Sequence, residues 1–141
     1  MPSSRTLAII KPDALARAKG GQILAHLEGA GFRLRAVRLL HLSDAQARAF
    51  YDVHRERPFF GSLVRFMTSG ECMPMVLERD DAVAELRRVI GATDPAEAAE
   101  GTVRRLFAES KERNAIHASD SDENAAREMR FFFPDTELLG S

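Results

Sequence analysis

Residues 6–13 of the chain, TLAIIKPD, show the first clear structural pattern of the sequence. A short, mostly apolar run is followed by Lys11 and Pro12, and such a run between turn signals is typical of a buried strand. Proline interrupts the strand pattern at this point. We therefore predict a buried strand over residues 6–10, with a lysine held between the strand and a proline turn.

Strand and helix patterns alternate outward from this strand. We expect helices over residues 20–29, from Asp44 onward, and over residues 59–67, 81–90 and 125–133, and strands over residues 32–42 and 72–77, with a further short strand before the last helix. Residues 91–114 show only a possible turn near residues 103–107, and a loop of that length is usually functional. Alternating strands and helices predict one sheet with helices packed on it.

Local signals add detail to these elements. A capping box at residues 43–46 starts one helix, and Ser121 and Pro134 mark the beginning and end of the last one. In residues 32–42 the side chains of Phe32, Leu34 and Ala36 are expected to face inward, against outward arginines. Pro74 predicts a bulge or a sheet edge, because proline cannot donate to the ladder. The tail, residues 135–141, is expected on the surface.

Composition limits the classes of protein. The chain has 141 residues, 45% of them hydrophobic, and a net charge of -1, so we expect one globular domain over residues 1–141 and no specific nucleic-acid binding. Cys72 is the single cysteine, which excludes an intrachain disulfide and a thiolate metal cage. With no leader-like or membrane-spanning apolar run, we expect a cytoplasmic protein that does not enter the membrane.

The common nucleotide motifs are missing. The sequence contains neither G-x-x-x-x-G-K-[ST] nor G-x-G-x-x-G, and no H-E-x-x-H metal motif. If the protein handles nucleotides, it does so without a glycine-rich cradle.

Residues 114–121, NAIHASDS, hold the strongest candidate for chemistry. Neutral imidazole is a good nucleophile near pH 7, and His117 is expected at a strand end beside a helix start, where anions bind well. Glu128 could fix its tautomer from the last helix. The alternatives are a structural histidine and an ordinary solvated carboxylate, although Asn114, Ser119 and Asp120 are residues that can ligate or orient.

Cations and aromatic side chains could complete a phosphate site. Lys11, Arg87, Thr93 and Arg104 could contact phosphates, but Arg88 and Arg105 are adjacent and the pattern does not say which member of each pair points inward. Phe59 or Phe60 could stack on a base, and we assign Phe60 to the core. The other histidines, His26, His41 and His54, are expected to be solvated.

Six segments in order make the chain resemble the nucleoside diphosphate kinases along nearly its whole length. They are TLAIIKPD (6–13), HRERPFFG (54–61), FMTSG (66–70), GATDP (91–95), GTVR (101–104) and NAIHASDS (114–121), the last being the active-site signature of that family. The resemblance implies an α/β (α+β sandwich) fold, with a ferredoxin-like antiparallel four-stranded sheet and helices packed on it. It also implies reversible transfer of the terminal phosphate from a nucleoside triphosphate to a nucleoside diphosphate, through a phosphohistidine.

The resemblance also assigns roles. His117 would be the nucleophile, supported by Glu128 and Ser119, with Tyr51 beside the transferring phosphoryl group. Phosphates would bind Lys11, Arg87, Thr93 and Arg104, ribose hydroxyls would bind Lys11 and Asn114, and the base would stack on Phe59 without hydrogen bonds to its edge, which suits all common bases. Mg²⁺ would be held mainly by the nucleotide phosphates, and the chain would form a homo-oligomer, a tetramer or hexamer.

The chain departs from the usual family pattern at residues 71–74 and 105–106, and its short tail puts the assembly in doubt. A second hypothesis is a catalytically inactive, ferredoxin-like nucleotide-binding regulatory module, which would need the nucleotide contacts but not the histidine.

Overall fold

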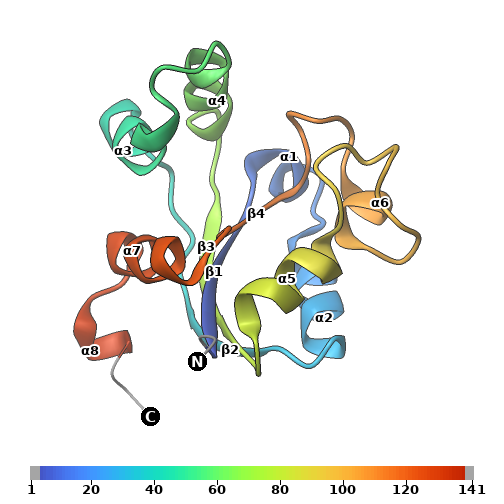
Figure 1. Ribbon diagram of the computed structural model, residues 1–141. Coiled ribbons are helices and arrows are strands. Elements are labelled where there is room, and N and C mark those ends of the chain that lie inside the picture. Colours follow the sequence, from blue (N-terminus) through green and yellow to red (C-terminus); the bar gives the residue numbers. More distant parts are fainter. Residues whose placement is uncertain (1–3, 139–141) are drawn as a thin grey trace.

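The computed structural model describes residues 4–138, which form one antiparallel sheet with helices on both faces (Figure 1). The strand order is β2-β3-β1-β4. The strands are β1 (Arg5–Ile10), β2 (Arg33–Val37), β3 (Met73–Glu78) and β4 (Ile116–Ala118). The helices are α1 (Pro12–Ala16), α2 (Gly20–Gly29), α3 (Asp44–Phe50), the 3₁₀ turn η1 (Asp52–His54), α4 (Phe60–Met67), α5 (Ala82–Ile90), α6 (Val103–Phe107), α7 (Asp122–Phe132) and α8 (Asp135–Leu138).

The central strand β1 is buried on both faces, which explains its continuous apolar run. Its odd-numbered side chains, Leu7 and Ile9, pack in a core with α3, α4 and α7, whereas Ala8 and Ile10 pack in a second core with α1, α2, α5 and α6. Figure 1 shows these two groups of helices on opposite sides of the sheet. The predicted ferredoxin-like α+β architecture is confirmed.

Strand β2 departs from the predicted side-chain alternation. Leu34 pairs with Leu77 and Ala36 with Val76, so the intervening Arg35 is an extra residue and forms a bulge. The bulge moves Ala36 to the opposite core from Phe32 and Leu34. The expectation that all three share one face was therefore wrong, and the strand ends at Val37 rather than at residue 42.

Pro74 lies in an interior strand, so the predicted sheet edge was also wrong. β3 pairs with β1 on one side and β2 on the other, and the bulge is in β2. The carbonyl of Pro74 accepts from Arg38 N at 3.0 Å, just past the end of β2. The nitrogen of Pro74 faces the same side, where regular pairing with β2 has stopped, so the missing N–H disturbs the ladder little.

The helix signals are confirmed with small changes. Ser43 and Gln46 form the capping box of α3, and Ser121 caps α7 by accepting from Asn124 N. The possible turn at residues 103–107 is helix α6. The short helix α1 after Lys11 was not predicted, and neither was α8 in the exposed tail, of which residues 139–141 lie outside the described part. No helix within residues 4–138 is long and apolar enough to cross a membrane.

Candidate active site

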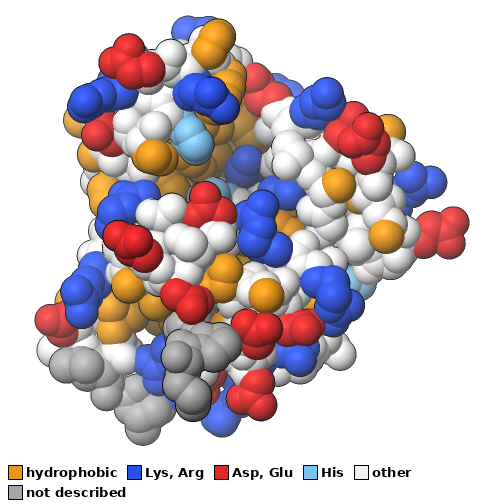
Figure 2. All heavy atoms as spheres, viewed as in Figure 1, with side chains coloured by type: hydrophobic (Ala, Val, Ile, Leu, Met, Phe, Trp, Pro, Cys, Tyr) orange, Lys and Arg blue, Asp and Glu red, His pale blue; other side chains and the backbone are white. Residues whose placement is uncertain are grey.

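A cavity of about 400 Å³ lies over β4 and contains His117. His117 pairs with Ile9 across the β1–β4 ladder, so its side chain faces the side of α3 and α7. Ile116 and Ala118 face the other core, as strand alternation requires. In Figure 2 this region is a hollow between the part of the molecule formed by α3 and α4 and the part near α6, with Lys or Arg and His side chains inside it.

His117 is held through one ring nitrogen by α7. Its Nε2 is 2.7 Å from Oε1 of Glu128, and the same oxygen accepts from Ser119 Oγ at 2.8 Å. Burial lowers the pKa of His117, although Glu128 opposes the shift. Burial works against ionisation of Glu128, but the bonds from His117 and Ser119 outweigh it and lower its pKa. A neutral imidazole beside a carboxylate must carry its proton on Nε2, which leaves the lone pair on Nδ1.

Aromatic rings from α3 and its end restrain the imidazole. The ring centroid of Phe50 lies 5.4 Å from that of His117, and the ring centroid of Tyr51 lies 6.0 Å away, both edge-on. Burial raises the pKa of the Tyr51 phenol, and its buried hydroxyl has no hydrogen-bond partner among the described residues. Tyr51 therefore offers an unused O–H donor beside the histidine.

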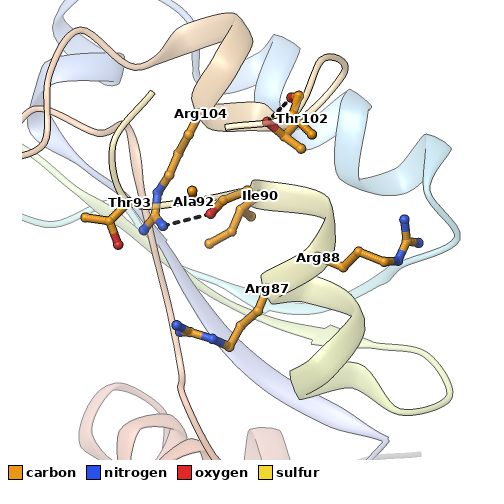
Figure 3. Close-up of a pocket in the computed structure, with 9 residues that line it drawn as sticks. Arg87, Arg88, Ile90, Ala92, Thr93, Thr102 and Arg104 are labelled. Atoms are coloured by element: carbon orange, nitrogen blue, oxygen red, sulfur yellow. Dashed lines mark hydrogen bonds between the residues drawn. The ribbon is translucent and has the colours of Figure 1, made fainter. Parts of the chain in front are cut away.

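The structure shows which member of each pair of adjacent arginines points into the cavity. Arg87 and Arg104 both line the cavity of His117, and Figure 3 shows Arg88 extending away from them. Arg88 pairs with Glu85 at 2.7 Å in solvent, and Arg105 is exposed. The guanidinium of Arg104 donates to the carbonyls of Gly91 at 3.1 Å and Ile116 at 2.8 Å.

Arg104 is held in place by its surroundings. Only 8% of the residue is exposed, and burial lowers its pKa to about 10, with the charge of Arg87 acting in the same direction. Its Nε atom is buried without a partner among the described residues. Gly91 has φ +89° and lies so close to Thr102 that a Cβ would fall 2.5 Å from Oγ1 of Thr102. Glycine at this position lets the backbone pass close to Thr102.

Lys11 lies at the end of β1, as the sequence predicts. Its Nζ donates to Oδ1 of Asn114 at 2.9 Å, a contact between residues 103 apart in the chain. Burial lowers the pKa of Lys11 to about 8, the charge of Arg104 contributes, and the carboxylates of Asp13 and Glu112 oppose the shift. Lys11 is therefore mostly charged at pH 7 and mostly neutral above about pH 8.

Two hydrogen bonds hold the segment before His117 in an unusual conformation. Ala115 has φ +73°, a left-handed value that is uncommon for a residue with a side chain. Its carbonyl accepts from Lys11 N at 2.8 Å, and its N–H donates to Oδ2 of the buried Asp13 at 3.1 Å. We call these two contacts the Ala115 clamp. The clamp fixes the position of Asn114 on one side and of β4 on the other.

Phe59 and Thr93 complete the set of predicted residues around the cavity. Phe59 is 45% exposed, and its ring centroid lies 5.5 Å from that of His54. His54, which was expected to be solvated, is half-buried and lines the cavity. Phe60 packs against the core, as expected. Of the site residues that the sequence predicts, Ser119 alone does not line the cavity, since it lies behind Glu128.

Several contributors were not predicted. Asp13 is visible in the sequence only as part of KPD, and its partner Ala115 is 102 residues away. Phe50, Asn124 and Arg127 also line the cavity, together with Asp120, which the sequence had already indicated as a residue that can ligate or orient. Asp120 and Asn124 are four residues apart across the start of α7 and hydrogen-bond at 2.6 Å, so helical spacing beside His117 was the available signal.

The protein offers no ready-made metal cage in its described part. No group of three or more His, Cys, Asp or Glu side chains within residues 4–138 is placed to hold a metal ion. Asp120, whose side chain accepts from Asn124, is the exposed carboxylate at the cavity wall. This donor set suits a hard cation that takes most of its oxygen ligands from phosphate groups and water.

Comparison with known proteins gives consistent results over nearly the whole chain. A family model described as nucleoside diphosphate kinase matches residues 4–138. A nucleoside diphosphate kinase of Chlorobium chlorochromatii is 58% identical over 97% of this chain and 98% of that protein. The crystal structure of the Aquifex aeolicus nucleoside diphosphate kinase superposes with a TM-score of 0.93 at 44% identity, covering 95% of this chain and 97% of that one. The Encephalitozoon cuniculi enzyme gives the same TM-score at 34% identity, covering 99% of this chain and 95% of that one.

Proposed function

Because the chain belongs to the nucleoside diphosphate kinase family, whose reaction moves the terminal phosphate of a nucleoside triphosphate to a nucleoside diphosphate, we propose that His117 carries the phosphate between the two nucleotides. The observation that supports this role is the 2.7 Å contact of Nε2 with Glu128 inside the cavity. It leaves Nδ1 as the free nucleophilic atom.

The transfer needs two matching half-reactions. The Nδ1 lone pair of His117 attacks the γ-phosphorus, an N–P bond forms, and the bond from the γ-phosphorus to the β–γ bridging oxygen breaks, so that the diphosphate leaves with the bond electrons. A second diphosphate then attacks the phosphohistidine and reverses the step. Glu128 is a positioning residue, because it accepts the Nε2–H bond and stabilises the positive charge that develops on the ring.

The remaining residues bind the nucleotide along the cavity. Arg87, Arg104 and Thr93 contact phosphates, and Tyr51 donates its unpaired hydroxyl near the transferring phosphoryl group. Lys11 and Asn114 bind the ribose hydroxyls, and Lys11 adds charge next to the phosphates. Phe59 offers its exposed ring to the base. Phosphoryl transfer requires positioning and charge stabilisation more than other chemistry, and these side chains suit that requirement.

Mg²⁺ belongs to this proposal as a partner of the nucleotide. The ion would be held by phosphate oxygens and water, with Asp120 as the nearby carboxylate, and it would supply neutralisation of phosphate charge. A homo-oligomer, a single domain over residues 1–141 and a cytoplasmic location stay predictions of the sequence. An inactive regulatory module would not require the His117–Glu128 pair, which is intact, so this alternative is not favoured.

Labelling with γ-phosphate-labelled ATP tests the role of His117. We expect a label that acid removes and base does not, as for a phosphohistidine, and transfer of that label to an added diphosphate. His117→Ala should lose both label and turnover. A label retained by this variant would show that another residue is the nucleophile.

The variant Glu128→Gln tests whether Glu128 positions His117 for the reaction or only supports the fold. The amide can still contact Nε2 but carries no charge, so we expect the rate of phosphoenzyme formation to fall by about 10- to 100-fold, with nucleotide affinity nearly unchanged. Met129→Leu, at the neighbouring position of α7, is the matched control and should keep the wild-type rate.

A further inference from the structure

The nucleotide cavity continues past Phe59 into a second hollow of about 440 Å³. Its lining consists of Lys11, Phe59, Leu63, Thr93, Lys111 and Glu112, and the first four of these also line the cavity of His117. The two spaces therefore meet at the ring of Phe59. If the phosphates lie beside His117 and the base lies on Phe59, the edge of the base faces this hollow.

The carboxylate of Glu112 is fixed at this end of the site. Its Oε2 accepts from Ser62 Oγ at 2.5 Å. Ser62 lies in α4, three positions after Phe59, so the bond ties the loop before Asn114 to the helix that follows the stacking ring. The charge of Glu112 is felt at the buried Lys11, where it opposes the lowering of the lysine pKa.

We propose that Glu112 reads the edge of the base and gives this protein a preference for guanine nucleotides, an inference that rests on the function proposed above. Guanine carries two adjacent donors, N1–H and the N2 amino group, and a carboxylate offers two acceptor oxygens to such a pair. Lys111, which lines the same hollow, adds a donor for the guanine O6.

Other bases fit this end of the site less well. Adenine and cytosine present one amino group next to an acceptor nitrogen. Uracil and thymine present one N–H between two carbonyl oxygens, which repel the carboxylate. The expected order is therefore guanine first, adenine and cytosine next, and uracil and thymine last. Stacking on Phe59 alone would give a much flatter order, because every base has a π-face.

Discharge of the phosphoenzyme by different acceptors tests the proposal. The protein is phosphorylated with ATP, freed of nucleotide and mixed with GDP or UDP. We expect the second-order rate constant for GDP to exceed that for UDP by about tenfold, since charge-assisted hydrogen bonds of this kind distinguish ligands on that scale. Glu112→Ala should bring the ratio close to one, because GDP loses its hydrogen bonds and slows, whereas UDP loses a repulsion and reacts at the same rate or faster. Ser62→Ala should give an intermediate ratio, because the carboxylate keeps its charge but loses its anchor.

Glu109→Ala is the matched control. Glu109 lies in the same loop and carries the same charge, but it pairs with Arg17 at 3.0 Å and lines neither space. It should keep the wild-type ratio. Equal rates with GDP and UDP in the wild-type protein would overturn the proposal, and so would a Glu112→Ala variant that slows both acceptors equally.

Failure of the proposed function would look different. In that case the wild-type protein takes up no phosphate from ATP, whatever its base preference. Equilibrium binding of GDP and UDP to the unphosphorylated protein then decides the question, because a GDP preference that Glu112→Ala removes supports base reading and equal affinities overturn it.

Discussion

The two ends of the proposed nucleotide site are built in different ways. The inner end, which we call the floor, consists of Lys11, Arg104, Asn114, His117 and Glu128. The outer end, the rim, consists of Val53, Phe59, Lys111 and Glu112. Lys11, Arg104, Asn114 and Glu128 are each 8% exposed or less, whereas Phe59 is 45% exposed and Val53 71%.

This difference follows from the elements that carry the residues. Floor residues lie at strand ends and on helices packed against the sheet, and contacts such as Lys11–Asn114 join distant parts of the chain. Rim residues lie in loops and short turns at the surface. A change in the floor should therefore affect chemistry and folding together, whereas a change in the rim should affect nucleotide choice with little effect on stability.

Substitution of the adjacent residues Arg104 and Arg105 should give the largest difference in activity and stability. Arg104→Leu removes a buried cation and leaves the carbonyls of Gly91 and Ile116 without their donor. We expect kcat/KM to fall by about 100- to 1000-fold and the free energy of unfolding to fall by about 2 kcal/mol. Arg105→Leu, on the exposed side of α6, should change the unfolding free energy by less than about 0.5 kcal/mol and leave kcat/KM within a few-fold. Similar losses in steady-state assays and denaturant unfolding of both variants would contradict the conclusion that burial of Arg104 in the floor makes it important for both activity and folding.

The pH dependence of nucleotide binding tests Lys11. Its pKa in the folded protein is about 8, lowered from 10.5 by burial and by Arg104, so the ammonium loses its proton as pH rises through about 8. We expect affinity for ADP, measured by calorimetry, to fall by about tenfold between pH 7 and pH 9. Lys11→Met should bind weakly at both pH values. A pH step that persists in this variant would assign the titration to another group.

Other groups of the site should not interfere in that range. Burial raises the pKa of Tyr51 well above its ordinary value, so the phenol stays protonated, and Arg104, whose pKa is about 10, keeps its charge up to about pH 9. The same Lys11 shift has a consequence for stability. Because the unfolded chain holds this proton up to a higher pH, the contribution of Lys11 to the free energy of unfolding should increase between about pH 8 and 10.5.

Substitution of the adjacent residues Phe59 and Phe60 should give the smallest difference in activity. Phe59→Ala removes the proposed stacking surface at the rim, and we expect KM for a diphosphate to rise about fivefold while the melting temperature stays nearly unchanged. Phe60→Ala should do the reverse, because Phe60 packs on the core: lower stability by about 2 kcal/mol and a KM close to that of wild type. Thermal unfolding and initial-rate measurements on the pair would show whether the rim can change independently of the fold.

The sequence predicts the floor better than the rim. Short apolar runs place Lys11 and His117 at β1 and β4, and the serines at positions 43 and 121 mark two helix starts that the structure confirms. These signals are local. The pairing partner of a strand is not, and for this reason the bulge at Arg35 and the interior position of Pro74 could not be predicted: both depend on where β2 ends against β3.

The direction of side chains was the other feature that the sequence could not predict. Arg87 and Arg88 are neighbours in α5, and only the packing of α5 against the sheet and the turn at Gly91 decides that Arg87 faces the cavity. Glu112 at the rim was missed for a related reason. Glu112 looks like an ordinary loop carboxylate until Ser62, 50 residues earlier, is found to hold it.

The Ala115 clamp also bears on when the protein becomes active during its synthesis. Asp13 leaves the ribosome 102 residues before its partner Ala115, and β4, with three residues, is too short to find its place alone. The early part of the chain can form β1 and α1, but the histidine is made about 100 residues later and is positioned only when it meets them and when Glu128 of α7 follows. A nascent or truncated chain that lacks this contact should therefore be inert toward nucleotides, so phosphate exchange begins only after synthesis has passed Glu128.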